Sequence, residues 1–304
     1  MTDPARTVEP EGRAAALFGA HRGAVVGAAY RVLGSLSDAE DVAQETWLRW
    51  SDVDPGTIGD PRAYLVRIGT RLALNRARQL TRQREDYVGP WLPEPVVDLD
   101  RVGVEHDVEV AESVSYAMLV LLESLTPAER AAFVLHEVFD VGYPEVADSL
   151  ERTEAGVRQL VHRAKVRLRE RAPRHPVDPS THAEVTSRFL RATRDGSIGD
   201  LVQLLAPDVV LVSDGGGVRR AALRPIQGRD KVLRFAVGVL GQAEATALTP
   251  DALEVNGQPA VGLYQTAPDG SRLLDSVFVL VLDGGLVATV LLLRNPGKLA
   301  AAGG

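Results

Sequence analysis

A three-helix pattern with short connections, between residues 125 and 171, constrains the fold of this chain more than any other feature. Thr126, Pro127 and Glu129 form a helix start signal, in which the threonine and the glutamate cap each other's backbone. The stretch "YPEVADSL" predicts a short helix, "ERT" a tight turn and "EAGVRQLVHRAKVRLRER" a longer helix. A short helix, a tight turn and a basic second helix are typical of a helix-turn-helix that binds DNA. The alternative is a generic helical bundle.

The last helix of this pattern has two distinct faces. Its packed face is predicted to consist of Val157, Leu160, Val161 and Ala164. Early side chains on the other face of such a helix contact base edges, and later cations contact phosphates. Arginine suits guanine and glutamine suits adenine. The predicted exposed side chains are Arg158, Gln159, His162, Arg163, Lys165, Arg167 and Arg169.

A second basic helix is predicted from residue 62 to about residue 84. Its buried face is predicted to contain Leu65, Ile68, Leu72 and Ala73, which recur at helical spacing. Its other face carries side chains of one sign, with acids only at its end: Arg67, Arg71, Asn75, Arg76, Arg78, Gln79, Arg82 and Arg84. Solvated surface helices normally mix charges of both signs. This face therefore favours a helix that binds a nucleic-acid backbone over the alternative, an ordinary surface helix.

The N-terminal part of the chain is expected to be helical after a disordered start at residues 1–12. A helical pattern runs from residue 14 to residue 50 and breaks at "GSLSDAED", where Ser37 is the predicted N-cap and Glu40 completes a capping box. Residues 51–61 are dense in Pro, Gly and Asp and predict a loop. Asp60 and Pro61 are predicted to start the next helix.

The sequence changes character after a Pro-rich boundary at residues 172–180. Helices are expected at 182–194, 197–205 and 229–240. Strand patterns follow in "DVVLVSD", "RRAALRPIQG", "DALEVNGQPAVGLYQT", "RLLDSVFVLVLDGG" and "LVATVLLL". Helices followed by a meander of strands predict an α+β domain with one curved antiparallel sheet.

Composition excludes several classes of protein. The chain has 304 residues, no cysteine and six scattered histidines, so disulfides and thiolate metal sites are excluded, and neither a metal site nor a cofactor is expected. No apolar run approaches the roughly 20 residues that a membrane span needs, and no signal peptide is apparent. We therefore expect a cytoplasmic protein without a membrane partner. The formal net charge of −7 conceals the two basic helices.

The helical half of the chain resembles the ECF (extracytoplasmic function) sigma factors of RNA polymerase. "AYRVLGSLSDAEDVAQETWLRW" and "DPRAYLVRIGTRLALNRAR" are similar to their region 2, and the helix-turn-helix stretch is similar to their region 4. Some members carry a SnoaL-like, cone-shaped C-terminal domain, with the markers "WLPEP", "DGGGK" and "NPDKL". Here these markers stand as "WLPEP" (91–95), "DGGGV" (214–218) and "NPGKL" (295–299), so Val218 and Gly297 depart from the pattern.

The resemblance implies partners and site residues. It implies binding to the RNA polymerase core, through the β′ clamp helices and the β subunit, and to promoter DNA. The polymerase-binding residues are expected to be Asp38, Asp41, Gln44, Glu45 and Leu48. The −10 element is expected to contact Arg67, Arg71, Asn75 and Arg78, and the −35 element Arg158, Gln159, His162, Arg163, Lys165 and Arg167. A dedicated anti-sigma factor is not expected.

The Pro-rich segment "YVGPWLPEP" (87–95) lies in the connection between the two helical regions. Trp91 and Leu92 supply apolar area, and the prolines lower the entropy lost on docking. We hypothesise that residues 91–95 contact the "DGGGV" and "NPGKL" segments and so set the separation of the two DNA-binding regions; the alternative is that they cap the region-2 bundle. The interdomain residues are expected to be Trp91, Leu92, Pro93, Asp214, Gly215, Gly216, Gly217, Asn295, Pro296 and Lys298.

Two other functions stay open at this level. The chain could be a helix-turn-helix regulator without polymerase contact, or a SnoaL-like isomerase or ligand-binding protein with a helical appendage. The groups available for catalysis in the cone are His182, Asp214, Tyr264 and Asp275. Because polar groups are sparse there, we expect no enzyme activity, although a pocket for a small ligand is retained as an alternative.

The predicted organisation has two all-α domains and one α+β domain. The boundaries are a disordered N-terminus (1–12), sigma region 2 (13–86), a linker with an acidic second half (87–111), sigma region 4 (112–174) and a SnoaL-like domain (175–304).

Overall fold

The computed structural model describes residues 10–98, 114–245 and 248–302. The chain divides into two compact units. The first unit comprises Met1–Thr81, Glu105–Ser113 and Leu121–Glu170, and the second comprises Arg82–Val104, Val114–Val120 and Arg171–Gly304. Most of the two predicted helical regions thus lies in one unit, and the described part of the linker belongs to the other. Residues 1–9 of the predicted disordered N-terminus and residues 99–111 of the linker lie outside the described residues, whereas residues 10–12 begin a helix, so the prediction of disorder is wrong there.

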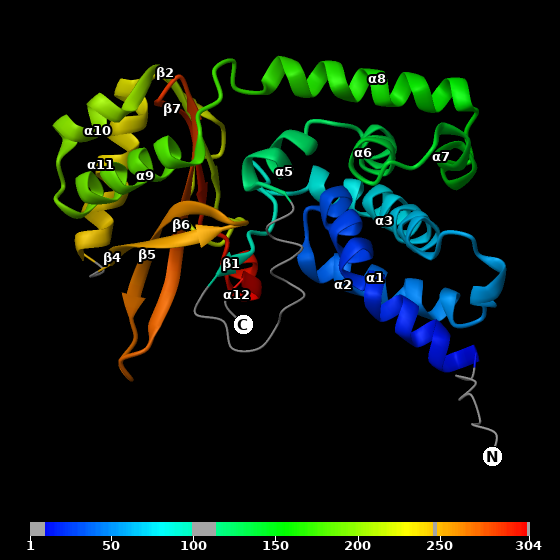
Figure 1. Ribbon diagram of the computed structural model, residues 1–304. Helices are drawn as coiled ribbons and strands as arrows, with labels where there is room; N and C mark the ends of the chain where they lie inside the picture. Colours follow the sequence, from blue (N-terminus) through cyan, green and yellow to red (C-terminus); the bar gives the residue numbers. More distant parts are fainter. Residues whose placement is uncertain (1–9, 99–113, 246–247, 303–304) are drawn as a thin grey trace. The chain divides into compact units, whose positions relative to one another are not determined.

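The first unit is helical (Figure 1). Its N-terminal part consists of α1 (Pro10–Leu33), α2 (Leu36–Trp50), the 3-10 turn η1 (Pro55–Thr57) and α3 (Pro61–Glu85). Its later part consists of α6 (Pro127–Phe133), the π-helical turn η2 (Val134–Val138), α7 (Tyr143–Leu150) and α8 (Glu154–Arg171), while α5 (Tyr116–Leu122) spans the boundary between the units. No helix among the described residues is long and apolar enough to cross a bilayer.

The helix starts follow the predicted capping signals with one exception. The capping box of Thr126 and Glu129 starts α6, and the Asp60 carboxylate accepts a 2.9 Å hydrogen bond from the Ala63 backbone N–H at the start of α3. The prediction of Ser37 as N-cap of the second helix is wrong, because Ser35 has the extended backbone of a cap and its Oγ accepts from the Asp38 N–H at 3.2 Å. Gly34, with φ of 66°, ends α1 just before it.

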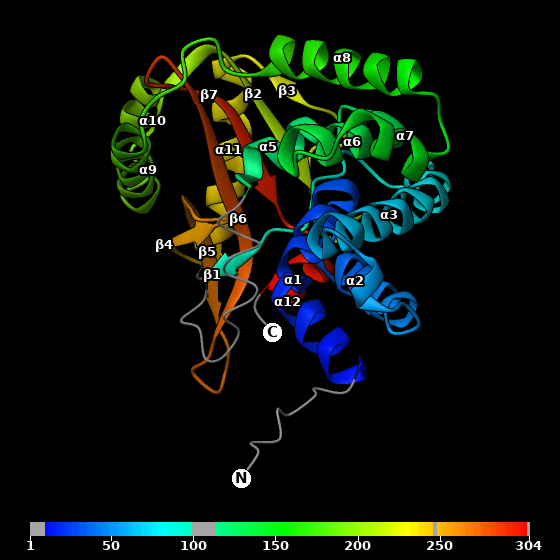
Figure 2. The same cartoon turned by 45° about the vertical axis from the view of Figure 1, so that its right-hand side comes forward.

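The second unit packs three helices on one face of a mixed sheet (Figures 1 and 2). The helices are α9 (Pro179–Arg194), α10 (Ile198–Leu204) and α11 (Arg229–Ala245). The sheet order is β1-β4-β5-β6-β7-β2-β3. The strands are β1 (Val97–Asp98), β2 (Leu205–Asp214), β3 (Ile226–Gln227), β4 (Thr249–Val255), β5 (Gln258–Thr266), β6 (Arg272–Asp283) and β7 (Leu286–Leu293), and the helix α12 (Pro296–Ala302) ends the described chain. The predicted α+β class with helical companion regions is confirmed.

Three details of the sheet differ from the prediction. The sheet is not wholly antiparallel, because β2 returns to pair with β7 in parallel. The run predicted at 251–266 is a hairpin of β4 and β5, since Asn256 and Gly257 adopt φ of 51° and 69° and form its turn. In the run predicted at 219–228 only β3 pairs, with β2, because Pro225 and the preceding loop supply no ladder.

Apolar side chains of the helices and the sheet form the core of the second unit. Phe189 of α9, Leu201 of α10 and Val232 of α11 meet Phe278 and Leu292 of the sheet. The edges of the sheet are left to β1 and β3, which are two residues long. Each edge strand is therefore too short to form by itself and is held in place by tertiary contacts.

Candidate polymerase and DNA interfaces and the linker anchor

Helix α8 presents the predicted basic face. Val157, Leu160, Val161 and Ala164 are buried, as predicted. Glu151 adopts the left-handed conformation, with φ of 53°, and its backbone N–H closes the end of α7, so the turn before α8 is tight. The side chains of Arg158, Gln159, His162, Arg163, Arg167 and Arg169 are exposed, and Lys165 is half-buried.

Carboxylates of the same unit hold several of the α8 cations. Glu129 of α6 is 2 % exposed and accepts from Arg163 Nε at 2.9 Å and from Arg167 Nη1 at 2.7 Å. Burial by itself raises the pKa of Glu129, but hydrogen bonds from Arg163 and Thr126 outweigh it and lower this pKa. Lys165 Nζ lies 2.7 Å from Glu137. Glu129 thereby fixes the arginines in the middle of α8 while leaving them about half exposed.

On α3, the four predicted −10 residues divide into two pairs. Arg67 Nη1 lies 3.3 Å from Glu145 Oε1 of α7, and Arg71 forms an ion pair with Glu151 in the helix-turn-helix turn. Asn75 and Arg78 are exposed further along the helix. Two of the cations expected to contact the −10 element are therefore engaged by acids of the predicted −35-binding region.

Helix α2 presents a narrow exposed stripe. Four of the five predicted polymerase-binding residues, Asp41, Gln44, Glu45 and Leu48, are exposed at helical spacing. Leu48 is 65 % exposed, whereas Val42 and Trp50 of the same helix are buried. Asp38, the fifth, is half-buried, and Arg76 donates to its Oδ1 at 2.8 and 3.0 Å.

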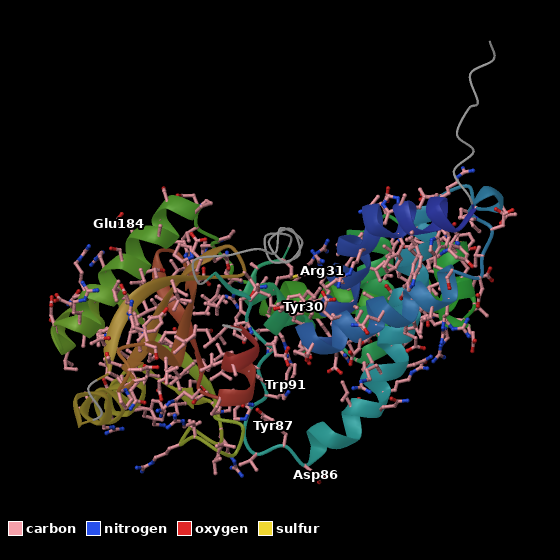
Figure 3. All side chains as sticks on the ribbon, turned by 90° about the horizontal axis from the view of Figure 1, so that it is seen from below. Tyr30, Arg31, Asp86, Tyr87, Trp91 and Glu184 are labelled. Atoms are coloured by element: carbon pink, nitrogen blue, oxygen red, sulfur yellow. The ribbon has the colours of Figure 1, made fainter. Side chains whose placement is uncertain are left out.

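In the second unit, Asp214 at the end of β2 anchors the Pro-rich segment. Its carboxylate is fully buried and accepts from the Leu92 backbone N–H at 2.9 Å and from Tyr87 Oη at 2.5 Å. It also accepts from Lys298 Nζ at 2.7 Å and from the Gly216 N–H at 3.0 Å. Figure 3 shows Tyr87 and Trp91 beside α12, which carries Lys298.

Lys298 binds the same segment through the Leu92 carbonyl and the Trp91 ring. It is 7 % exposed, donates to the Leu92 carbonyl and lies 3.9 Å from the centroid of the Trp91 ring, within cation–π range. Asn295 Nδ2 donates to Tyr87 Oη at 2.9 Å. Burial, together with the hydrogen bond to Asp214, raises the pKa of Tyr87 well above its ordinary value. The residues at this anchor are thus joined by one hydrogen-bonded network.

The glycines after Asp214 allow the chain segments to approach closely. Gly216 and Gly217 have φ of 62° and 71°. A Cβ on Gly216 would lie 2.5 Å from the Asn295 side chain, and one on Gly217 would lie 3.3 Å from Val88. At Gly216 both the backbone conformation and the available space therefore require glycine, and at Gly217 the left-handed backbone favours it.

A backbone ladder extends the anchor beyond "WLPEP". Val97 and Asp98 form β1, which pairs with Val255 and Glu254 at the edge of the sheet. The Asn256 backbone N–H donates to the Val96 carbonyl at 2.9 Å, and its Oδ1 accepts from the Val96 N–H at 3.2 Å. Sequence reasoning missed this strand; the β-branched pair in "PVVD" is its only local signal.

A tyrosine of the same unit binds the Pro93 carbonyl. Tyr116 of α5 is fully buried and donates from Oη to the Pro93 carbonyl at 2.8 Å. The Pro-rich segment is therefore held at Tyr87, Leu92, Pro93 and Val96.

The two departures from the family markers lie at exposed positions. Val218 is 77 % exposed. Gly297 is exposed, and its N–H donates to the Asn295 side chain at 3.0 Å. The charged groups that bind the linker in this structure are Asp214 and Lys298, and both are retained in this chain.

The groups considered for catalysis do not converge. Asp275 pairs with Arg294 at 3.4 Å and Arg219 at 3.5 Å, and Asp214 belongs to the linker anchor. His182 contacts the Leu280 carbonyl, and Arg272 lies over the Tyr264 ring. The cavity between helices and sheet measures about 30 Å³, room for about one water molecule, and its walls are mostly apolar. The described residues contain no cluster that could hold a metal ion.

The geometry defines a two-part helical DNA-binding module joined to an α+β unit, and comparison with known proteins agrees. Residues 17–83 match the family model Sigma-70 region 2, and residues 115–168 match Sigma-70, region 4. The chain is 38 % identical to the ECF RNA polymerase sigma factor SigJ of Mycobacterium tuberculosis, over 92 % of this chain and 91 % of that protein. It is 30 % identical to the probable ECF sigma factor SigI of the same species, over 93 % and 94 %.

A solved structure extends the agreement to the whole chain. The crystal structure of M. tuberculosis SigJ superposes with a TM-score of 0.75 and 34 % identity, covering 95 % of this chain and 99 % of that one. The chain therefore belongs to the ECF RNA polymerase sigma factors. The superposition includes the α+β unit, so SigJ has the same combination of helical regions and α+β unit.

Proposed function

We propose that this sigma factor binds the RNA polymerase core through α2 and directs it to promoters, with α3 at the −10 element and α8 at the −35 element. Promoter DNA and the polymerase core are then its two partners. The exposed stripe around Leu48 supports the first contact, because an exposed leucine between acids and an amide suits a mixed apolar and polar interface. The helix-turn-helix geometry of α7 and α8 supports the contact of α8 with the −35 element.

The ion pairs of α3 suggest how promoter contact begins. Arg67 and Arg71 must exchange Glu145 and Glu151 for phosphate oxygens before α3 can bind the −10 element. Exposed pairs of this kind stabilise a structure by at most about 1 kcal/mol. The exchange is therefore inexpensive, and DNA phosphates can compete with the two glutamates.

We infer that the α+β unit regulates initiation in cis by holding the linker. The observation that carries this proposal is the binding of Leu92, through both its N–H and its carbonyl, by the buried pair of Asp214 and Lys298. A held linker confines the chain between the −10-binding and −35-binding helices. Confinement raises the effective concentration of the second DNA contact once the first has formed. Loss of the anchor is expected to lower initiation.

The remaining expectations follow from this assignment. A sigma factor acts by binding, so we propose no catalytic role for the α+β unit, and its site of action is the cytoplasm, where transcription takes place. The 30 Å³ cavity gives little support to a ligand in the cone. The expectation that no dedicated anti-sigma factor is required stays a prediction.

Run-off transcription tests the proposal. Purified core enzyme is incubated with the full chain and fragmented genomic DNA of the source organism, and RNA products are mapped. We expect discrete start sites with the wild-type chain and severalfold less product with W91A/L92A, together with faster proteolysis of the linker. L273D, at an exposed position of β6, is the control and should transcribe normally. No product and no co-migration with core would reject the function; unchanged activity and protease resistance of W91A/L92A would reject the role of the anchor alone.

A further inference from the structure

The α+β unit carries a concentrated basic segment that none of the interfaces above uses. Between Arg219 and Arg234 the chain has six lysines or arginines and one carboxylate, that of Asp230. The rest of residues 171–304 is acidic, with eight lysines or arginines against twelve aspartates or glutamates. Positive charge is thus gathered in one stretch of a unit that is otherwise negative.

The fold brings this stretch to one edge of the sheet. The loop after β2 leads to β3, which is the edge strand and pairs with β2 through Ile226 and Gln227. The Gly228 N–H donates to the Val209 carbonyl, and α11 starts at the next residue, beside β2 and β3 (Figure 2). Arg224 is two residues before β3, and Lys231 and Arg234 are one helical turn apart in the first turns of α11.

The cations of this edge differ from those of α8 in their partners. Arg220, Arg224, Lys231 and Arg234 are exposed. Among the residues that the structure describes, no carboxylate lies within ion-pair distance of these four side chains. On α8, by contrast, Arg163 and Arg167 are bound by Glu129. The four side chains are therefore available to an external anion without the loss of an internal pair.

We propose that this edge, which we call the β3–α11 edge (Arg220, Arg224, Lys231 and Arg234), is a third DNA-binding surface that contacts backbone phosphates of duplex DNA. Exposed guanidinium groups form paired hydrogen bonds with phosphate oxygens. Phe235, the aromatic residue next to Arg234, is half-buried and lines the internal cavity, so it is not presented for stacking on unpaired bases. The proposal assigns phosphate contacts without base specificity.

The proposal goes beyond the proposed function and is strengthened by it. A sigma factor engaged at two promoter elements keeps its tethered α+β unit close to the same duplex, so even weak phosphate contacts act at high effective concentration. Such contacts would add affinity to every promoter alike and leave the choice of promoter to α3 and α8.

Salt-dependent binding to a random-sequence duplex tests the surface without polymerase. Fluorescence anisotropy measures the affinity of the full chain for a labelled 40-base-pair duplex between roughly 50 and 200 mM salt. Each phosphate contact contributes about 0.9 to the slope of log affinity against log salt. For R224Q/R234Q we expect the slope to fall by about 2 and binding near 0.1 M salt to weaken roughly tenfold.

The control is R188Q/R191Q on α9, which removes the same charge from exposed positions outside the edge. We expect wild-type binding from this variant and wild-type melting temperatures from both. An unchanged slope in R224Q/R234Q, or an equal fall in both variants, would overturn the proposal. The proposal would also be overturned if R224Q/R234Q bound DNA normally but co-migrated less with core enzyme. That result would show that the edge contacts an acidic protein surface instead of DNA. Since the duplex assay contains no polymerase, its outcome is independent of whether the chain initiates transcription.

Discussion

Lys298 Nζ lies 2.7 Å from Asp214 Oδ2, and both side chains are buried around the backbone of Leu92. Neither charge can be removed alone without leaving the other in a site of low dielectric. Breaking a buried pair from one side typically costs about 3–5 kcal/mol, whereas replacing both partners costs much less. The anchor is therefore strong only as a pair, which makes it testable by a double-mutant cycle.

The first prediction concerns this pair. K298M is expected to lower the free energy of unfolding of the α+β unit by about 3–5 kcal/mol, and D214N/K298M by clearly less. Chemical denaturation followed by tryptophan fluorescence measures both, since Trp91 lies against Lys298. K231M, at an exposed lysine, serves as control. A loss in D214N/K298M equal to the sum of the losses in K298M and D214N would show that the two charges are not coupled.

The second prediction concerns the acids that bind α3. E145Q/E151Q should free Arg67 and Arg71 and increase initiation and promoter affinity by a few-fold, while the free energy of unfolding changes by less than about 1 kcal/mol. Open-complex formation by holoenzyme at limiting promoter DNA provides the measurement. E184Q/D208N removes two exposed acids from the other unit and controls for net charge. An equal gain in the control would assign the effect to general electrostatics.

Sequence reasoning succeeded where the signals were local. The tight turn between α7 and α8 and the helical spacing of four apolar residues on α8 predict these two helices, and the Thr126 capping box predicts the start of α6. It failed where pairing partners are distant in sequence. The parallel pairing of β2 with β7 and the two-residue strand β1 depend on tertiary contacts, which leave no periodicity to detect.

The site residues divide in the same way. Asp214 and Lys298 were named through the family markers, yet no local pattern indicates that they meet at Leu92. The pairing of Arg67 with Glu145 was equally invisible, because an exposed arginine has the same sequence signature whether or not an acid from another helix binds it. Their roles in binding polymerase and DNA stay predictions.

The third prediction uses the lowered pKa of Glu129. Because its folded pKa lies below the unfolded one, the carboxylate stabilises the fold at neutral pH, and this contribution is lost as the pH falls through and below its ordinary pKa of about 4.3. The wild type should therefore be more stable than E129Q at pH 7, and the difference should shrink toward pH 3.5. Unfolding free energies at pH 7, 5 and 3.5 check this. A difference that is independent of pH would show that the ion pairs with Arg163 and Arg167 add nothing.

The last prediction isolates the polymerase contact from folding. Leu48 is 65 % exposed, so L48D removes little internal packing, and the free energy of unfolding should stay within about 0.5 kcal/mol of the wild type. At the centre of an interface, an unpaired carboxylate would be desolvated without a partner, which typically costs more than 2 kcal/mol and weakens binding by more than tenfold. Co-migration with core enzyme and run-off transcription should both fall, whereas L273D, an equally drastic change at an exposed leucine of the other unit, should reduce neither. If L48D binds core as tightly as the wild type, the stripe on α2 is not the polymerase-binding surface.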